Sequence, residues 1–365
     1  MVGLSLVNLT KKFLGFSLGP LNLKVDDGEI LVMIGPSGSG KTTVLNLISG
    51  LLKPDSGSIL VDEIDITTLP VESRKIGYTF QNPSLFPHLN VYENIVFGLT
   101  KKSRSREDSD LEIKKLLEDL GISHLTDRYI HGLSGGEMQK VSLARMLVTK
   151  PKIMLMDEPL AHLDILTKRK LRLELRRVLR RQGVPTIYVT HFEDDVYGLA
   201  DSVSVLQNGV IEHTARLESI LKYQDNLSSP FLSNIISSGG GNYLEGNVVK
   251  SKDGVTTFKI GSHLLETLGE YSIGCKVGIL VRPEDIILSK EMVKTSARNI
   301  VKAKVAKVST KNAGIVDIHL IIDTFHIISR ITEEARTDLQ IMEDDYLFAI
   351  FKASSPQVVR EEQYH

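Results

Sequence analysis

Hydrophobic positions along the first 230 residues follow two kinds of pattern. Three short runs are largely apolar and have the length of strands: Ile30–Ile34, Ile153–Met156 and Thr186–Val189. Longer stretches with helical spacing lie between them, among them Lys41–Ile48, Asp110–Leu120 and Leu166–Gln182. Strands buried on both faces show no alternation of polar and apolar residues, and helices commonly connect them in parallel. The pattern therefore predicts an α/β domain with a mainly parallel sheet.

A break in this pattern comes near residue 230. The stretch 226–242 is rich in Ser, Gly and Asn and includes Gly239–Gly241, which is typical of a linker or an exposed loop. Short β-rich runs then follow at close spacing: Gly246–Val249, Val255–Ile260, Val277–Val281, Val301–Val308, Val316–Ile322 and Phe325–Ile331. Several small strands without long helices predict a small barrel or sandwich.

We therefore expect two domains. The α/β domain would span 1–230, with a helical subdomain at about 85–150, and a linker at 231–242 would join it to a β-rich domain at 243–365. The length of 365 residues suits two or three domains, at about 150 residues each. Both halves of the β-rich domain are strand-rich, but no clear internal sequence repeat connects them.

The charge balance excludes some classes of function. Lys and Arg number 44 against 45 Asp and Glu, a net charge of −1, and residues 243–365 hold 16 against 17. Proteins that neutralise many phosphates usually have a basic excess, which neither part has. No stretch approaches 18 consecutive apolar residues, the N-terminus lacks a secretory signal, and Cys275 is the single cysteine. We expect a neutral, soluble, intracellular protein without an internal disulfide.

A glycine-rich loop follows the first apolar run. Residues 35–42 read G-P-S-G-S-G-K-T and match the phosphate-loop pattern G-x-x-x-x-G-K-[ST] between a strand and a helix. Backbone N–H groups of such a loop surround the phosphates, Lys41 reaches the β- and γ-phosphates, and the Thr42 hydroxyl can ligate Mg²⁺. The helix dipole favours the anion further. The predicted nucleotide-binding residues are Gly35, Pro36, Ser37, Gly38, Ser39, Gly40, Lys41, Thr42 and Thr43.

Two carboxylates, Asp157 and Glu158, end the second apolar run. Asp157 can join the coordination shell of Mg²⁺, and Glu158 can polarise the water that attacks the γ-phosphate. An acidic pair after a strand is a weak signal alone. The phosphate loop upstream gives it weight, so we expect both residues at the nucleotide site.

A third motif, L-S-G-G-E at 133–137, comes just before a predicted helix. Ser134, Gly135 and Gly136 would present a hydroxyl and N–H groups at a helix N-terminus, which makes a second anion site. One subunit has no use for two γ-phosphate sites around one nucleotide. Two copies arranged head to tail do, because each completes the other's site.

With these motifs, residues 1–230 resemble the ATP-binding cassette (ABC) ATPase family. The motifs keep the family's order: the phosphate loop, Gln81 in T-F-Q, the L-S-G-G-E signature, D-E-P at 157–159, Asp164, and His191 in T-H. The resemblance implies a P-loop NTPase fold that uses ATP and Mg²⁺, followed by an all-β, OB-like regulatory domain.

The resemblance also implies roles for matching residues. Phe13 would stack on adenine, and Gln81 would sense the γ-phosphate through Mg²⁺ and report to a membrane partner. Lys41 would hold the phosphates, Glu158 would be the general base, and His191 would contact the γ-phosphate as the switch residue.

The signature would act across the dimer. The residues expected to contact ATP held by the partner subunit are Ser134, Gly135, Gly136 and Asp164. The chain departs from the family pattern in two places. The signature ends in Glu137 rather than the commoner Gln, and Ala161 and His162 replace the usual Ser-Ala, which removes a hydroxyl and adds a titratable ring near the dimer interface.

The kind of transport protein follows from what surrounds the single cassette. A single cassette must pair with a second copy or a paralogue, and we expect a homodimer at the cytoplasmic face of the membrane. With no membrane span of its own, the chain would bind separate permease subunits. An extracytoplasmic substrate-binding protein would act on it only indirectly. Residues 85–94 resemble the region of importers that receives the coupling helix of the permease; an ordinary surface loop is the alternative.

The second domain resembles regulatory domains of importer ATPases. V-R-P-E-D-I at 281–286 resembles the TOBE type, and 295–300 with 351–355 resemble the small oxyanion-binding repeat of molybdate/tungstate importers. A tetrahedral dianion needs hydroxyls, N–H donors and modest positive charge. The candidate regulatory residues are Ser296, Arg298, Asn299, Lys352 and Ser354. The alternative is a strand cap with a solvated arginine, and Ala303 stands where the family usually has Gly.

Three hypotheses for the function of the chain remain. We expect the ATPase subunit of an oxyanion importer whose activity the accumulated intracellular anion restrains. The same ATPase could instead serve sulfate, sugar, iron or polyamine uptake. A soluble ABC ATPase acting on nucleic acid would need basic clusters among its aromatic residues, which the β-rich domain lacks, so we expect no nucleic-acid partner. A storage module without catalysis does not fit Lys41, Glu158 and His191.

Overall fold

The computed structural model describes residues 3–99, 107–222, 241–310, 314–323 and 325–362. The chain divides into two compact units, residues 1–220 and 221–365. The predicted linker at 231–242 lies outside the described residues, except for its last two positions. Among the helices described, none is long and apolar enough to cross a membrane.

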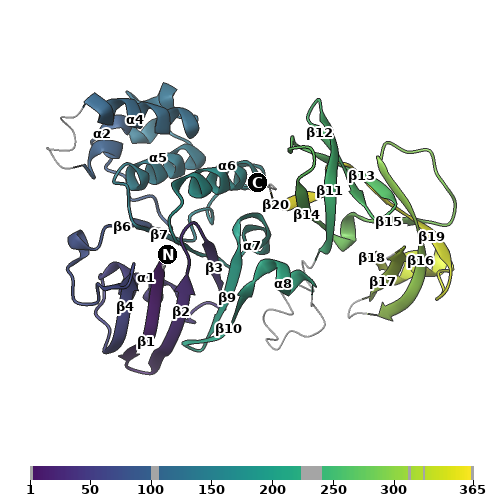
Figure 1. Cartoon of the computed structure of the whole chain (residues 1–365), viewed down its shortest axis with the longest axis horizontal. Coiled ribbons are helices and arrows are strands. Elements are labelled where there is room, and N and C mark those ends of the chain that lie inside the picture. Colours follow the sequence, from purple (N-terminus) through teal and green to yellow (C-terminus); the bar gives the residue numbers. More distant parts are fainter. Residues whose placement is uncertain (1–2, 100–106, 223–240, 311–313, 324, 363–365) are drawn as a thin grey trace. The chain divides into compact units, whose positions relative to one another are not determined.

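A six-stranded sheet forms the centre of the first unit (Figure 1). Its order is β10 (Val210–Arg216), β9 (Ser202–Gln207), β3 (Ile30–Ile34), β8 (Thr186–Val189), β7 (Ile153–Asp157) and β6 (Ile76–Thr79). Strands β9, β3, β8, β7 and β6 run parallel, and β10 joins β9 antiparallel. The three predicted apolar strands are adjacent at its centre and fully buried, which confirms the α/β prediction.

An antiparallel sheet packs beside it. Its order is β2 (Phe16–Val25), β1 (Leu4–Phe13), β4 (Ser56–Val61) and β5 (Ile64–Asp65). The buried side of this sheet shares one apolar core with β3, β7, β8 and helix α1 (Lys41–Ser49). That core fixes α1, and with it the phosphate loop at its N-terminus.

The first unit contains six further helices among its described residues. They are α2 (Val91–Val96), α4 (Glu107–Asp119), α5 (Gly135–Leu147), α6 (Ile165–Gln182), α7 (Glu193–Leu199) and α8 (Leu217–Lys222), and a single 3₁₀ turn lies at each of 71–73, 123–125 and 130–132. Figure 1 shows α2 and α4 beside α5 in the region predicted as the helical subdomain. Helix α5 contacts α2, α6 and β6, so it connects this region to the central sheet.

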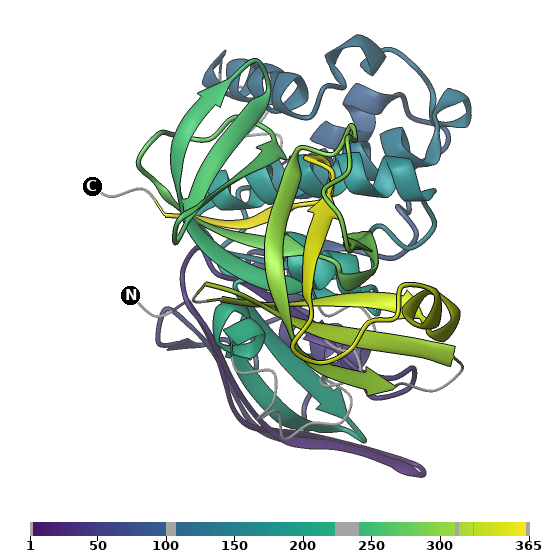
Figure 2. The ribbon, with the colours of Figure 1, turned by 90° about the vertical axis from the view of Figure 1, so that its right-hand side faces the viewer.

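The second unit holds two five-stranded antiparallel sheets around one apolar core (green to yellow in Figure 2). The first sheet has the order β13 (His263–Leu268), β12 (Val255–Ile260), β11 (Asn242–Lys252), β14 (Lys276–Val281) and β20 (Gln357–Glu362). The second has the order β15 (Ile287–Ser289), β19 (Tyr346–Phe351), β16 (Asn299–Thr310), β17 (Ile315–Ile322) and β18 (Phe325–Thr332). A short helix, α10 (Glu333–Asp338), follows β18, and a 3₁₀ turn spans Pro283–Asp285.

The two halves of this unit have the same plan. Strands β11–β14 and β16–β19 repeat one order, and each half then contributes a fifth strand to the other half's sheet, β15 beside β19 and β20 beside β14. An internal repeat is therefore present in the fold although the sequence shows none clearly. The exchange of end strands ties the halves into one domain.

Candidate functional site

The phosphate loop turns tightly between β3 and α1, and glycine is required at its ends. A Cβ atom at Gly35 would lie 2.0 Å from the carbonyl oxygen of Leu206. One at Gly40, the left-handed N-cap of α1 with φ of 105°, would lie 2.7 Å from Leu18 Cδ1. A backbone carbonyl at Gly35 and packed side chains at Gly40 therefore leave no room for a Cβ atom.

Two polar side chains of this loop face inward. Lys41 is 8 % exposed, and its ammonium group donates to the carbonyl oxygens of Gly35 (2.8 Å) and Pro36 (3.0 Å). Burial lowers the pKa of Lys41, against the opposing effect of the nearby carboxylates. Ser39 Oγ is buried without a partner among the described residues. An unpaired hydroxyl and a buried cation in one loop fit a phosphate ligand.

Asp157 lies at the end of β7, directly across from α1. Its carboxylate accepts hydrogen bonds from the hydroxyls of Thr42 and Tyr78, yet burial raises the pKa of Asp157 above the ordinary range. Tyr78 was missed in the sequence; it lies on β6 beside β7, and its hydroxyl oxygen is also 3.2 Å from Asn46 Oδ1. Burial raises the pKa of the Tyr78 phenol as well.

The oxygens of Thr42 and Asp157 are ligands that Mg²⁺ prefers. Groups of three or more His, Cys, Asp and Glu side chains that could hold a metal are absent from the described residues. A magnesium ion here would therefore draw its other ligands from the predicted Gln81, from water and from the nucleotide, and when bound it would neutralise charge on the phosphates.

Glu158 and His191 meet at the same edge of the sheet. Strands β7 and β8 are neighbours, with Asp157 paired to Val189, so the residues that follow them emerge side by side. Glu158 has a left-handed backbone, with φ of 44°, which turns its side chain out of the strand. His191 Nδ1 lies 3.0 Å from Glu158 Oε1, and the imidazole is 52 % exposed. A carboxylate and an imidazole are thus paired beside the phosphate loop.

Gln81 and Phe13 are both exposed. Gln81 follows β6, which runs parallel to β7, so it emerges at the same sheet edge as Asp157. Phe13 ends β1 and is 44 % exposed, 6.3 Å from the ring of Phe16. Phe16, which sequence reasoning did not single out, lies nearer the loop, because a Cβ atom at Gly40 would be 3.1 Å from its ring.

The signature residues begin α5. Ser134 is its N-cap and forms a capping box with Glu137: the hydroxyl and backbone N–H of Ser134 donate to Glu137 Oε2 at 2.7 and 2.8 Å. These bonds hold the pKa of Glu137 below its usual range. A Cβ atom at Gly136 would lie 2.9 Å from Thr167 Cγ2, so this glycine lets α5 approach α6 within the same chain.

The start of α6 is likewise capped. Asp164, predicted to act across a dimer, is the N-cap of α6, and its side chain accepts from the backbone N–H of Thr167 at 3.0 Å. His162 is exposed two residues earlier. A capping role for Asp164 is therefore present within one chain.

The loop that follows Gln81 is held by the buried Asn94 and the half-buried Arg145. The amide of Asn94 is fully buried, donates to the carbonyl oxygens of Phe86 and Leu89, and accepts from the backbone N–H of Phe86. The guanidinium of Arg145 donates to the carbonyl oxygens of Pro83 and Ser84. Loop 83–90 thus has a fixed shape although much of it is exposed.

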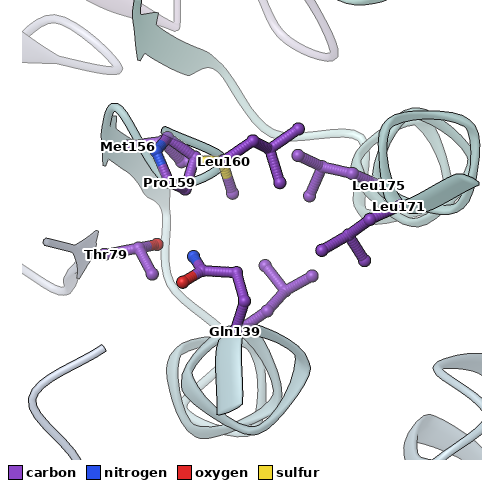
Figure 3. A pocket seen from close by; sticks show the side chains of 8 residues that line it. Thr79, Gln139, Met156, Pro159, Leu160, Leu171 and Leu175 are labelled. Atoms are coloured by element: carbon purple, nitrogen blue, oxygen red, sulfur yellow. The ribbon is translucent and has the colours of Figure 1, made fainter. Parts of the chain in front are cut away.

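A small cavity lies where α5 and α6 face β6 and β7 (Figure 3). Leucines and a methionine line most of it, and the amide of Gln139 points inward. The phosphate-loop residues are not part of its lining. This cavity is therefore separate from the paired groups described above.

The candidate anion residues of the second unit divide into two sets. Ser296, Arg298, Lys352 and Ser354 are exposed, and Arg298 Nε lies 3.9 Å from Glu266 Oε2. Asn299 is different: it is 1 % exposed, accepts from the backbone N–H of Glu266 (2.7 Å) and donates to its carbonyl oxygen (2.9 Å). These backbone bonds give Asn299 a structural role, and we omit it from the anion site proposed below.

Comparison with known proteins identifies the class. Residues 18–161 match the ABC transporter family, and residues 295–356 match the TOBE domain. A nucleotide-free ATP-binding cassette from an ABC transporter superimposes with a TM-score of 0.57 at 30 % identity, covering 64 % of this chain and 98 % of that one. The fold is therefore that of an ABC ATPase followed by a TOBE domain.

Relatives that align along most of the chain make the assignment narrower. The molybdate/tungstate import ATP-binding protein of Pyrococcus horikoshii is 37 % identical over 97 % of this chain and 99 % of its own. The spermidine/putrescine import protein of Mesoplasma florum is 38 % identical over 79 % and 81 %. The sulfate/thiosulfate import protein of Xylella fastidiosa is 36 % identical over 80 % and 82 %. The chain belongs to the ATP-binding subunits of ABC importers.

Proposed function

We propose that this chain hydrolyses ATP as a head-to-tail homodimer at the cytoplasmic face of the membrane and drives uptake of molybdate or tungstate through separate permease subunits. The pairing of Glu158 with His191 beside the phosphate loop carries the proposal, because it places a base and a γ-phosphate ligand together. Residues 85–94, whose shape the buried amide of Asn94 fixes, are the proposed contact for the permease.

The proposed chemistry uses side chains already in place. The ammonium of Lys41 leaves the loop carbonyls for the phosphates of ATP, where its charge offsets theirs. Thr42, Asp157 and Gln81 would hold Mg²⁺, which would require Asp157 to be ionised. Glu158 accepts a hydrogen bond from a water in line with the γ-phosphate. His191 contacts both the Glu158 carboxylate and the γ-phosphate and so fixes their relative positions. Ser134 and Gly136 of the second copy would close the site.

The substitution Glu158→Gln tests the catalytic assignment. The amide keeps the size and the contact with His191 but cannot accept the proton, so ATP turnover should fall about 100-fold or more while ATP binding persists. Asp127→Asn on an exposed turn is the matched control. Unchanged turnover in Glu158→Gln would remove Glu158 from the role of base.

A mixing experiment tests the shared site. Dimers of Ser134→Ala with Lys41→Ala chains contain one intact site and one doubly defective site, so turnover should recover toward half of wild type. Each variant alone should be inactive. A mixture as inactive as its components would contradict the head-to-tail arrangement.

The cargo proposal is supported by the Pyrococcus relative, which aligns along nearly the whole chain, and by the donors in the TOBE domain. Ser296, Arg298, Lys352 and Ser354 supply hydroxyls and positive charge that suit an oxyanion, through which the accumulated anion would restrain transport. Micromolar molybdate or tungstate should raise the melting temperature of the full chain, and Arg298→Gln should abolish the shift. An equal or larger shift with sulfate or spermidine would assign a different cargo.

A further inference from the structure

A buried carboxylate, Asp195, lies directly behind the turn that carries His191. It is 1 % exposed and begins α7 together with its neighbours. Its Oδ1 accepts from Arg172 Nε at 2.8 Å, and its Oδ2 accepts from the hydroxyls of Thr190 (2.8 Å) and Tyr188 (3.2 Å). Three donors from α6, β8 and the turn after β8 therefore converge on one carboxylate, which fixes its position.

Thr190 connects this carboxylate to both sides of His191. Its hydroxyl donates to Asp195 and accepts from the backbone N–H of Phe192 at 3.1 Å. The backbone N–H of Asp195 donates in turn to the carbonyl oxygen of Phe192, also at 3.1 Å. The residues before and after His191 are thus tied to one buried group, which fixes the backbone that carries the imidazole.

The outer side of the turn is covered as well. The ring of Phe192 lies 4.0 Å from the ring of His191, and Lys168 Nζ of α6 lies 3.6 Å from the centre of the Phe192 ring. A cation over an aromatic face is an attractive contact. Asp195 therefore holds the turn through Thr190 and the backbone of Phe192, and Lys168 holds it through the Phe192 ring. His191 is in contact with Glu158.

We infer that Thr190 and Asp195 are positioning residues for ATP hydrolysis: they hold His191 at Glu158 and at the γ-phosphate without touching either substrate or water. This inference rests on the proposed ATPase function. A catalytic group displaced by about 1 Å can lose about 100-fold in rate, so the hydroxyl of one buried threonine can matter to turnover from behind the site.

The test compares two threonines of the same strand region. Thr190→Val removes the bridging hydroxyl at nearly constant volume and should lower kcat about 10-fold or more while the KM for ATP changes less than about two-fold. Thr190→Ser, which restores the hydroxyl, should return kcat to within about three-fold of wild type. Thr186→Val is the matched control, because Thr186 is equally buried on β8 and, within the described part of the chain, its hydroxyl donates to the nearby carbonyl oxygen of Val184.

The outcomes distinguish a role of Thr190 in positioning His191 from a role in stability alone. The inference is overturned if Thr190→Val loses melting temperature but keeps the kcat of Thr186→Val, or if Thr190→Ser fails to rescue. Thr190→Ala carries the same comparison should the valine variant not fold. Glu158→Gln, measured in parallel, reports on the proposed function: activity there would refute the ATPase mechanism, whereas an inactive Glu158→Gln beside a fully active Thr190→Val would refute only the positioning role.

Discussion

Asn242 and Asn299 occupy equivalent places in the two halves of the second unit, and each binds the backbone of the other half. Asn242 begins β11, donates to the carbonyl oxygen of Ile328 on β18 at 2.9 Å and accepts from its N–H. Asn299 begins β16 and makes the same pair of bonds with Glu266 on β13, at 2.9 and 2.7 Å. Two reciprocal clamps thus hold the halves together.

We expect Asn242→Ala and Asn299→Ala each to destabilise the second unit by about 2–4 kcal/mol, because each leaves a buried N–H and C=O without a partner. Amide hydrogen exchange followed by mass spectrometry would show the loss as faster exchange in both sheets. Asn247→Ala is the control, since Asn247 lies on the same strand β11 but is exposed. Exchange in Asn299→Ala equal to that in the control would show that the clamp does not hold the halves.

The sequence predicted some features of this chain well, whereas the roles of Asn242 and Asn299 were beyond it. Buried parallel strands have an unmistakable apolar pattern, and the phosphate-loop, signature and D-E motifs have fixed local spacing, so both were predictable from the chain alone. The repeat in the second unit was not, because it lies in the order of the strands, and the asparagines that join its halves have partners 33 and 86 positions away in sequence. A polar residue with backbone partners looks, in a sequence, like a ligand donor, and Asn299 was accordingly predicted as one.

The network behind His191 was missed for a similar reason. Thr190 and Asp195 are close in sequence, but Arg172 reaches them from α6, and only the fold brings the three together. Tyr78 was overlooked because nothing in its local sequence marks a tyrosine that will face Asp157 across two adjacent strands. Residues that act through long-range contacts carry no local signal.

We expect the ionised Asp157 carboxylate to lower the stability of the folded chain. Burial raises its pKa, so the folded chain binds this proton more tightly than the unfolded chain does. Stability therefore falls as pH rises from the ordinary aspartate pKa, about 3.9, through the raised value, and stays reduced above it. We expect Asp157→Asn to melt at a higher temperature than wild type at pH 7 without Mg²⁺ or nucleotide, and the difference to vanish near pH 3.

Thermal unfolding across pH checks this expectation. The exposed Asp127→Asn variant should show no such gain at any pH. Adding ATP and Mg²⁺ should stabilise wild type but not Asp157→Asn, because the variant lacks the charged ligand. A variant less stable than wild type at pH 7 would mean that the hydrogen bonds from Thr42 and Tyr78 outweigh the cost of burial.

Glu137→Gln should weaken the start of α5 slightly and strengthen the ATP-dependent dimer. The carboxylate accepts two bonds from Ser134 at a helix N-terminus, and its lowered pKa means that this contribution is present above the ordinary glutamate pKa and lost as pH falls through the folded value. We expect a loss of about 0.5–1 kcal/mol at pH 7.

The expected strengthening of the ATP-dependent dimer follows from the proposed head-to-tail arrangement. Removing a negative charge beside Ser134 reduces repulsion of the partner's γ-phosphate, so less ATP should drive association in a Glu158→Gln background, measured by sedimentation velocity. Glu118→Gln, an exposed position of α4, is the charge-matched control. An unchanged ATP requirement would place Glu137 away from the shared nucleotide.

Arg74 provides a last test, because it holds the helix that carries the phosphate loop. The side chain is 3 % exposed, and its guanidinium donates to the carbonyl oxygens of Leu47 and Ile48 in the last turn of α1, and also to those of Thr67 and Leu69. A planar fork with five N–H groups can satisfy four carbonyls at once, whereas an ammonium cannot.

Arg74→Lys should therefore destabilise the first unit by about 3 kcal/mol or more, since several buried carbonyls lose their donors. Because the C-terminus of α1 would loosen, we also expect weaker ATP binding, visible as a higher half-saturating ATP concentration in equilibrium binding. Arg177→Lys on the exposed face of α6 should change neither quantity. Loss of stability with normal ATP affinity would mean that the core around α1, rather than Arg74, sets the position of the phosphate loop.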